Sequence, residues 1–137
     1  MRIVGIDFGE KRIGVAAGDD RMRLAVPVTT VESRGDPVGE IESIVTEQHA
    51  ETLVVGLPLS LTGAEGPQAQ RVREVVDALA KRLTIPVHTY DERLTTAQAA
   101  RLPGGSTRKA TSGAASKDAV AASIMLQAYM DSQRPYD

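Results

Sequence analysis

Three β-rich runs open the sequence, and they restrict the chain to folds that begin with an antiparallel meander. Residues 2–8 and 12–18 are rich in Ile, Val and Ala and are separated by the short polar turn 9–11, a pattern typical of a β-hairpin. A third run at 24–31 follows the polar turn 19–23. The pattern therefore predicts three consecutive strands.

Helical and extended patterns alternate after the meander. Asp-Pro at 36–37 supplies a helix N-cap and a first-turn proline, and apolar residues continue at helical spacing to about His49. The apolar run 52–56 is typical of a strand that is covered on both faces. Beyond the Gly/Pro-containing loop 57–67, the apolar spacing predicts a second long helix and then a strand at 85–90.

The last third of the chain completes an α/β pattern. The segment 95–112 is expected to hold a short helix, stopped by Pro-Gly-Gly, and then a mobile loop. An apolar helix at 114–130 closes the chain. The order of elements predicts an α/β fold with a five-stranded mixed sheet and helices on both faces. With 137 residues, we expect a single domain, 1–137.

The composition excludes several kinds of chemistry. Without cysteine the chain has no disulfide, no Cys-ligated zinc and no thiol nucleophile, so any metal must bind to oxygen or histidine ligands. The sequence has no apolar run of membrane-spanning length and no signal-peptide pattern at its start, so we expect a cytoplasmic protein that has no contact with membranes.

The net charge of −2 does not indicate a nucleic-acid-binding protein, but the distribution of charge is uneven. The segment 101–117 contains no acid, and its basic residues are Arg101, Arg108, Lys109 and Lys117. This segment is either a solvated loop or a patch that binds a polyanion.

Asp7 lies within an otherwise apolar strand pattern. Alternation places it on the same face as Ile3 and Gly5, where an ionised carboxylate needs a compensating partner. The alternative is a strand-end Asp that turns towards solvent and bonds the hairpin backbone.

Asp118 lies on the apolar face of the last helix, which includes Ala122 and Met125. If Ser116 caps this helix, Asp118 is a first-turn acid that the helix dipole stabilises. If Ser112 is the cap, Asp118 lies a full turn deeper and the dipole explanation weakens.

Asp91 and Glu92 end the last predicted strand. Strict alternation gives Asp91 the same face as Val87 and Thr89, but strand ends commonly twist or bulge, so the residues alone leave both acids open. An acid on the first strand, one after a later strand and one on the last helix would repel one another unless a cation holds them. Hard oxygen ligands of this kind favour Mg²⁺ or Mn²⁺, which can support phosphodiester hydrolysis by water.

The sequence resembles the YqgF or RuvX family of Holliday junction resolvases, within the ribonuclease H-like superfamily. The matching segments cover nearly the whole chain in order: GIDFGEKRIGVA at 5–16, VVGLPLSLTGAEGPQA at 54–69, YDERLTTAQA at 90–99 and KDAVAASIMLQAY at 117–129. The resemblance implies a ribonuclease H-like fold and a metal-binding, catalytic triad of Asp7, Glu92 and Asp118. It also favours Glu92 over Asp91.

The resemblance further implies a bacterial nuclease that acts on nucleic acid, either at the 5′ end of pre-16S ribosomal RNA or on branched DNA. Symmetric cleavage of a junction needs two active sites, so a homodimer would favour the DNA role and a monomer the RNA role. The residues expected to contact nucleic acid are Lys11, Arg12, Arg93, Arg108, Lys109 and Lys117.

Two other functions are compatible with parts of the sequence. One is a nucleic-acid-binding module that keeps the fold without catalysis, which the presence of all three acids disfavours. The other is an actin-like ATP-binding domain, because an Asp-Phe-Gly hairpin also opens that fold. Those proteins close two such domains over ATP, whereas this chain supplies one. The loop 56–66 lacks the Gly-Lys-Ser/Thr ending of a P-loop, although its backbone and the following helix could bind a phosphate.

Overall fold

The computed structural model describes residues 1–9, 11–58, 66–91 and 117–133. Its strands are β1 (Arg2–Phe8), β2 (Arg12–Asp19), β3 (Leu24–Glu32), β4 (Thr52–Leu57) and β5 (Val87–Asp91). Its helices are α1 (Pro37–Glu47), α2 (Pro67–Arg82) and α5 (Lys117–Ser132). The short helix and the mobile loop expected within 95–112 lie outside the described residues.

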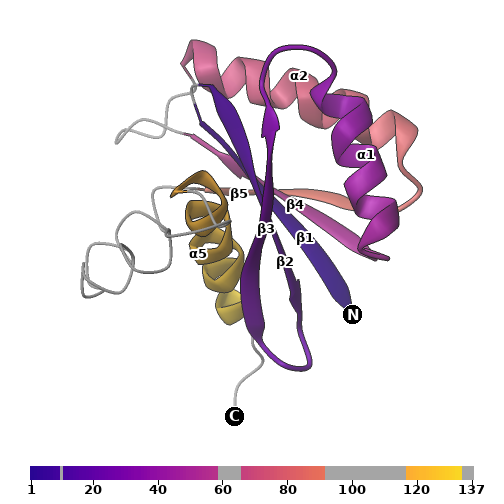
Figure 1. The fold of residues 1–137 in the computed structure, drawn as a ribbon, viewed down its shortest axis with the longest axis vertical. Coiled ribbons are helices and arrows are strands. Elements are labelled where there is room, and N and C mark those ends of the chain that lie inside the picture. Colours follow the sequence, from indigo (N-terminus) through magenta and orange to yellow (C-terminus); the bar gives the residue numbers. More distant parts are fainter. Residues whose placement is uncertain (10, 59–65, 92–116, 134–137) are drawn as a thin grey trace.

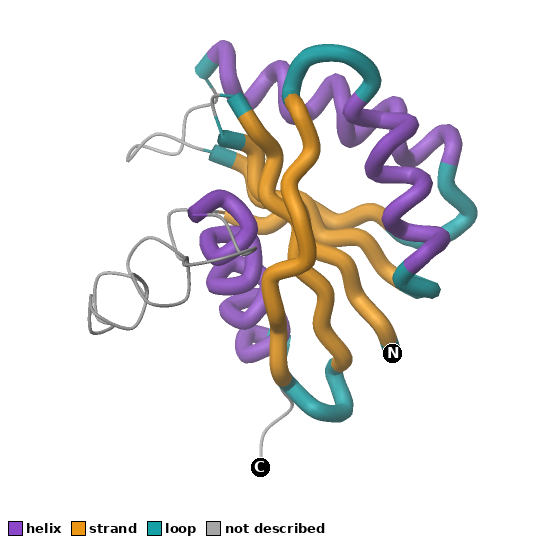
Figure 2. The backbone as a smooth tube through the Cα atoms, in the orientation of Figure 1, coloured by secondary structure: helices purple, strands orange, loops and turns teal. Residues whose placement is uncertain are grey.

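The five strands form one mixed sheet in the order β3-β2-β1-β4-β5. The first three strands pair antiparallel, as the meander predicted, whereas β4 pairs parallel to β1 and β5 parallel to β4. Helices lie on both sides of this sheet, with α1 and α2 on one side and α5 on the other (Figures 1 and 2). The predicted fold class is therefore confirmed.

The face below α1 and α2 carries the larger core. Alternate residues of β1 supply Val4, Ile6 and Phe8 to it, as the period of two predicts. The other members of this core come from β2, β3, β4, α1 and α2 and are mainly Ile, Val and Leu. Burial of these branched side chains removes the apolar surface of both helices from water.

The opposite face packs against α5 and is lined by smaller residues. Ile3, Ala16 and Val54 contact the helix through Met125 and Leu126. At Gly5, an added Cβ would lie 3.0 Å from Leu126 Cβ, so the helix sits directly against the backbone of β1. This close approach determines where the first turn of α5 lies.

Several element ends differ from the sequence prediction by one or two residues, and those of β5 and α1 have local reasons. β5 begins at Val87 instead of Ile85, because Pro86 has no N–H to donate to a neighbouring strand; its carbonyl accepts a hydrogen bond from Leu53 N at 3.0 Å. α1 begins after Asp36, whose carboxylate accepts from Gly39 N at 3.1 Å, as the Asp-Pro pattern predicted. It ends at Glu47, and His49 follows with a left-handed φ of 54°. Within the described ranges, no helix is long and apolar enough to cross a membrane.

Candidate active site

One edge of the sheet brings together the ends of three strands and the beginnings of three helices. β1, β4 and β5 are parallel and end there, and we call this the carboxyl edge. The first residues of α1 and α2 lie beside the end of β1, and the first turn of α5 lies over the β1–β2 hairpin. Because helix N-termini carry partial positive charge, this edge favours bound anions.

Asp7 lies at this edge, near the end of β1 and on the α5 face. Its partner on β2 is Gly14 and its partner on β4 is Gly56. Both neighbours lack side chains, so no side chain of an adjacent strand flanks the carboxylate at these two positions. The predicted face of Asp7 is confirmed, since Ile3 and Gly5 of the same strand contact α5.

Gly14 lets the first turn of α5 lie directly on the sheet. An added Cβ at Gly14 would lie only 1.9 Å from the carbonyl oxygen of Asp118 and 3.0 Å from Ala119 N. The backbone of Asp118 therefore rests on the residue that pairs with Asp7. Paired residues in an antiparallel sheet have Cα atoms about 5 Å apart, so the structure brings Asp7 and Asp118 together on one face.

The carboxylate of Asp118 points along the hairpin turn. Its Oδ1 lies 3.1 Å from where a Cβ of Gly9 would be, and its Oδ2 lies 4.0 Å from Nη1 of Arg12. The side chain is 33% exposed, and Asp118 lies in the first turn of α5. Both serines considered as the cap, Ser112 and Ser116, lie outside the described residues, so the choice between them stays a prediction.

Asp91 faces away from these two acids. It pairs with Leu57, which belongs to the core under α1 and α2, whereas Tyr90 pairs with Gly56 on the face of Asp7. The alternation expected for Asp91, on the face of Val87, is therefore confirmed. Glu92 lies outside the described residues.

The predicted nucleic-acid contacts divide into two groups. Lys11, Arg12 and Lys117 are exposed at the carboxyl edge, and Arg12 lies between Asp118 and Glu32, 3.8 Å from Glu32. Arg93, Arg108 and Lys109 lie outside the described residues. Arg12 is thus within ion-pair distance of Asp118, at 4.0 Å.

The donor chemistry at this edge suits a hard divalent cation, because Asp7 and Asp118 offer only carboxylate oxygens. Residues 1–9, 11–58, 66–91 and 117–133 contain no group of three or more His, Cys, Asp or Glu arranged to hold a metal ion. A site with three acidic ligands at this edge would need Asp7, Asp118 and a third acid from outside the described residues.

The sequence reading missed the glycines that build the site. Gly9, Gly14 and Gly56 surround the two acids, whereas the sequence pattern indicates only a turn for Gly9 and strands for Gly14 and Gly56. A signal was present, because Gly14 interrupts an apolar strand and an isolated glycine in a strand often marks the close approach of another backbone.

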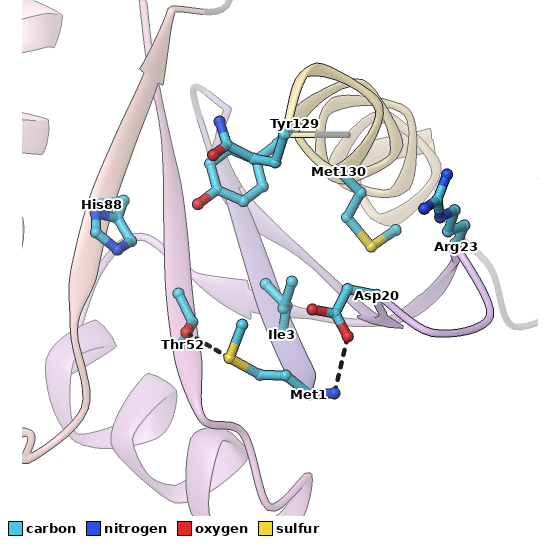
Figure 3. Close-up of a pocket in the computed structure, with 9 residues that line it drawn as sticks. Met1, Ile3, Asp20, Arg23, Thr52, His88, Tyr129 and Met130 are labelled. Carbon is cyan, nitrogen blue, oxygen red and sulfur yellow. Dashed lines mark hydrogen bonds and ion pairs between the residues drawn. The ribbon is translucent and has the colours of Figure 1, made fainter. Parts of the chain in front are cut away.

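A cavity of about 250 Å³ lies at the opposite edge of the sheet and contains none of the predicted acids. Figure 3 shows its polar groups bonded to one another: the N-terminal ammonium lies 2.8 Å from Asp20 Oδ1, and Thr52 Oγ1 donates to the Met1 sulfur at 3.4 Å. The hydrogen bond to Asp20 raises the pKa of the Met1 ammonium. The cavity is thus separate from the carboxyl edge.

The sequence relatives of this chain carry nuclease names. The sequence model of the RuvX family, described as Holliday junction resolvase, matches residues 1–132. A protein of Chloroflexus aggregans that is named for pre-16S rRNA nuclease activity is 42% identical over 134 residues, covering 96% of this chain and 94% of its own length. A protein of the same name from Roseiflexus sp. is 42% identical over 135 residues, covering 97% and 96%.

Solved structures agree with the fold. Thermus thermophilus RuvC in complex with a Holliday junction superposes with a TM-score of 0.60 at 17% identity, covering 97% of this chain and 95% of RuvC. The fowlpox virus Holliday junction resolvase gives a TM-score of 0.58 at 12% identity, covering 96% and 99%. These likenesses establish a ribonuclease H-like architecture, while the family match and the 42% identical relatives establish the family. The chain therefore belongs to the RuvX family, and it is a nuclease that hydrolyses phosphodiester bonds.

Proposed function

We propose that residues 1–137 form one nuclease domain that cuts structured nucleic acid with the help of Mg²⁺ or Mn²⁺. Asp7, Glu92 and Asp118 are its metal-binding, catalytic acids. The observation that carries this proposal is the contact between Gly14 and the backbone of Asp118, which brings Asp118 beside Asp7 at the carboxyl edge. A fold without catalysis would have no need to hold two carboxylates together there.

The family resemblance favours Glu92 over Asp91 as the third acid, and the register of β5 supports this choice. Tyr90 lies in the same row as Asp7, and Asp91 lies on the opposite face. Successive residues of a strand point to opposite faces, so position 92 is the next one that alternation assigns to the face of Asp7.

The chain's own residues have distinct tasks in this reaction. Asp7 and Asp118 are carried by a central strand and a docked helix, which place their backbones side by side. A divalent ion held by Asp7, Glu92 and Asp118 would supply Lewis acidity and would make a water molecule more acidic. Arg12 and Lys11 are exposed on the adjoining hairpin and hold the phosphate chain over the acids. Lys117, Arg93, Arg108 and Lys109 extend this contact along the substrate.

Precursor ribosomal RNA is the favoured substrate and branched DNA the alternative. Relatives 42% identical over nearly the whole chain are named for the RNA role, whereas the resolvase structures are at most 18% identical among those compared. Either substrate places the enzyme in the bacterial cytoplasm. A homodimer is expected only for the junction role, since symmetric cleavage needs two active sites.

The test is metal-dependent cleavage by Asp7→Asn, Asp118→Asn and Glu92→Gln, assayed side by side on a four-way DNA junction and a structured rRNA precursor. Each substitution removes charge stabilisation worth several kcal/mol. The cleavage rate of each variant should therefore fall by at least about 100-fold. Thermal melting should show the fold intact in all three.

Two carboxylates serve as matched controls. Asp77→Asn removes an exposed acid from α2, and Asp91→Asn removes the acid on the opposite face; both should cleave at the wild-type rate. Cleavage by Asp7→Asn at the rate of Asp77→Asn would refute the proposed acids and point to a contaminating nuclease.

A further inference from the structure

Nucleic acid extends beyond the active site of a nuclease, so further phosphates of the substrate lie on the surfaces that adjoin the proposed acids. The described ends of β4 and β5, residues 56–58 and 90–91, contain no cation and carry one acid, Asp91. A second surface is formed by the turn of the β1–β2 hairpin together with the β3–α1 loop, 33–36, and we call it the hairpin–loop surface. Its described cations are Lys11, Arg12 and Arg34. Of these two surfaces, charge favours the hairpin–loop surface as the path of a polyanion.

A backbone hydrogen bond holds the β3–α1 loop against the hairpin. Ser33 N donates to the carbonyl oxygen of Lys11 at 3.1 Å. Arg12 pairs with Glu32 in the register of β2 and β3. Arg34 follows Ser33 directly, and consecutive Cα atoms are about 3.8 Å apart. The backbones of the three cations are therefore neighbours, although Arg34 is distant from the other two in sequence.

Arg12 connects this surface to the proposed acids. Its Nη1 lies 4.0 Å from Oδ2 of Asp118, and its Nε lies 3.8 Å from Oε2 of Glu32. Asp118 also adjoins the hairpin turn itself, since an added Cβ at Gly9 would lie 3.1 Å from its Oδ1. A phosphate chain that crosses the hairpin turn from Asp118 therefore passes Arg12 and comes next to Lys11 and Arg34.

The charges of Lys11 and Arg34 are free for an external anion. Both residues are exposed, and neither side chain forms an ion pair or a hydrogen bond with another described residue. Gly35 has a left-handed φ of 91°, and an added Cβ there would meet nothing within 4 Å, so the loop beside Arg34 is open. By contrast, the exposed Arg82 lies 2.6 Å from Glu42.

The acids that face this surface are already engaged. Glu32 lies beside Arg12. The carboxylate of Asp36 caps α1 by accepting a hydrogen bond from Gly39 N at 3.1 Å. Glu40 lies in the first turn of α1, where the helix dipole offsets part of its charge. These acids therefore leave the side chains of the other two cations without a partner.

The residue types of this surface suit phosphate rather than bases. Arginine and lysine bind phosphate oxygens through charge-assisted hydrogen bonds. The described residues 11–12 and 33–36 include no aromatic side chain on which a base could stack. Contacts to phosphate carry no sequence information, so binding here should be the same for any base sequence.

We propose that the substrate strand leaves the proposed acids across the hairpin–loop surface, where Arg34 binds one of its phosphates beside Lys11. The inference rests on the proposed nuclease function and deepens it. It adds a phosphate-binding residue, and it gives the strand a direction, over β2 and β3 and away from β4 and β5.

The test is the salt dependence of binding, measured by fluorescence anisotropy in EDTA so that no cleavage occurs. The probes are two labelled hairpin RNAs of the same shape and different base sequence. Each phosphate contact releases about one counterion, so Arg34→Ala should reduce the slope of log K against log salt by about one for both probes. Its melting temperature should not change, because Arg34 is exposed and unpaired among the described residues.

Two variants serve as controls. Arg21→Ala removes an exposed arginine from the β2–β3 turn, at the opposite edge of the sheet, and should keep the wild-type slope. Arg34→Lys keeps the charge and should also keep the slope, since a phosphate accepts a lysine as a point charge.

The proposal is overturned if Arg34→Ala binds with the slope of Arg21→Ala, if its loss of slope depends on base sequence, or if Arg34→Lys loses as much as Arg34→Ala. Arg34→Ala should show the same loss of slope when it is combined with Asp7→Asn. Failure of the proposed acids would appear in the cleavage assay and failure of this surface in the slope, so the two are distinguishable.

Discussion

The two faces of the sheet are built from side chains of different size, and each size serves a different purpose. Under α1 and α2 the sheet presents residues such as Ile6, Ile13 and Leu53, which are fully buried. Under α5 the same strands present smaller residues at the neighbouring positions: Gly5, Gly14, Ala16, Gly18 and Gly56. The large residues keep the helices away from the backbone, and the small ones let α5 reach it.

This difference separates stability from the geometry of the site. Branched residues contribute the free energy of apolar burial, to which many positions add small amounts. A glycine contributes little burial, but it fixes how near a helix can come. Substitutions on the α5 face should therefore change cleavage first, and substitutions on the other face should change stability first.

Among substitutions outside the proposed acids, Gly14→Ala should have the largest effect on activity. The new Cβ would meet backbone atoms of Asp118 and Ala119, which cannot move without moving the first turn of α5. A shift of about 1 Å at a catalytic group can cost about 100-fold in rate, and overpacking costs about 1–3 kcal/mol of stability. Cleavage rates and urea denaturation of the purified variant measure the two effects.

Gly18→Ala is the matched control on the same strand. Its Cβ would meet the flexible end of Met130, at 3.0 Å from Cε, with one backbone atom, Leu24 O, at 3.1 Å. It lies at the opposite edge from Asp118, so cleavage should stay near the wild-type rate. Equal loss of cleavage by both variants would contradict the positioning role of Gly14.

Leu53→Ala should have the largest effect on stability while sparing the site. Leu53 is fully buried in the core under α1 and α2, near the start of β4 and away from the carboxyl edge. Truncation of a buried Leu costs about 2–5 kcal/mol, through lost burial and a residual cavity. Urea denaturation measures this loss, and cleavage per folded molecule should be unchanged. A fall in that specific rate would show that the large-residue face also positions the acids.

The fold was predictable because it is encoded by local periodicity. Alternation correctly gave the two faces of β1, including that of Asp7, and the Asp-Pro pattern at Asp36 gave the start of α1. Because the chain begins with a meander and continues with crossover helices, only a mixed sheet satisfies the order of elements. Each of these predictions uses residues that are neighbours in sequence.

The site was only partly predictable because it depends on contacts between distant segments. Gly14 and Asp118 are far apart in sequence, and no local period indicates that one rests on the other. The depth of Asp118 in its helix stayed open because two serines offered equivalent caps. The family resemblance supplied what periodicity did not, namely the choice of Glu92, which remains a prediction.

The smallest expected effect is on the alkaline stability of the α5 face, where the described residues include an edge-to-face pair of Tyr90 and Tyr129 with ring centroids 5.9 Å apart. Burial raises the pKa of Tyr129 above its ordinary value of 10.0, and burial followed by the charges of Asp91 and Asp131 raises that of Tyr90. The unfolded chain then loses these protons at lower pH than the folded one, so stability falls as pH rises above about 10.

Tyr129→Phe keeps the ring contact and removes the ionisable hydroxyl, so it isolates this titration from packing. Urea midpoints of the variant and the wild type should run parallel from pH 8 to about pH 10, and above that the variant should lose less stability than the wild type. Subtracting the two curves removes the contribution of lysines, which titrate in the same range. If the two curves run parallel throughout, Tyr129 is as hydrated in the folded protein as in the unfolded chain. In that case α5 packs less tightly over the β5 side of the sheet than over the glycines that hold Asp118.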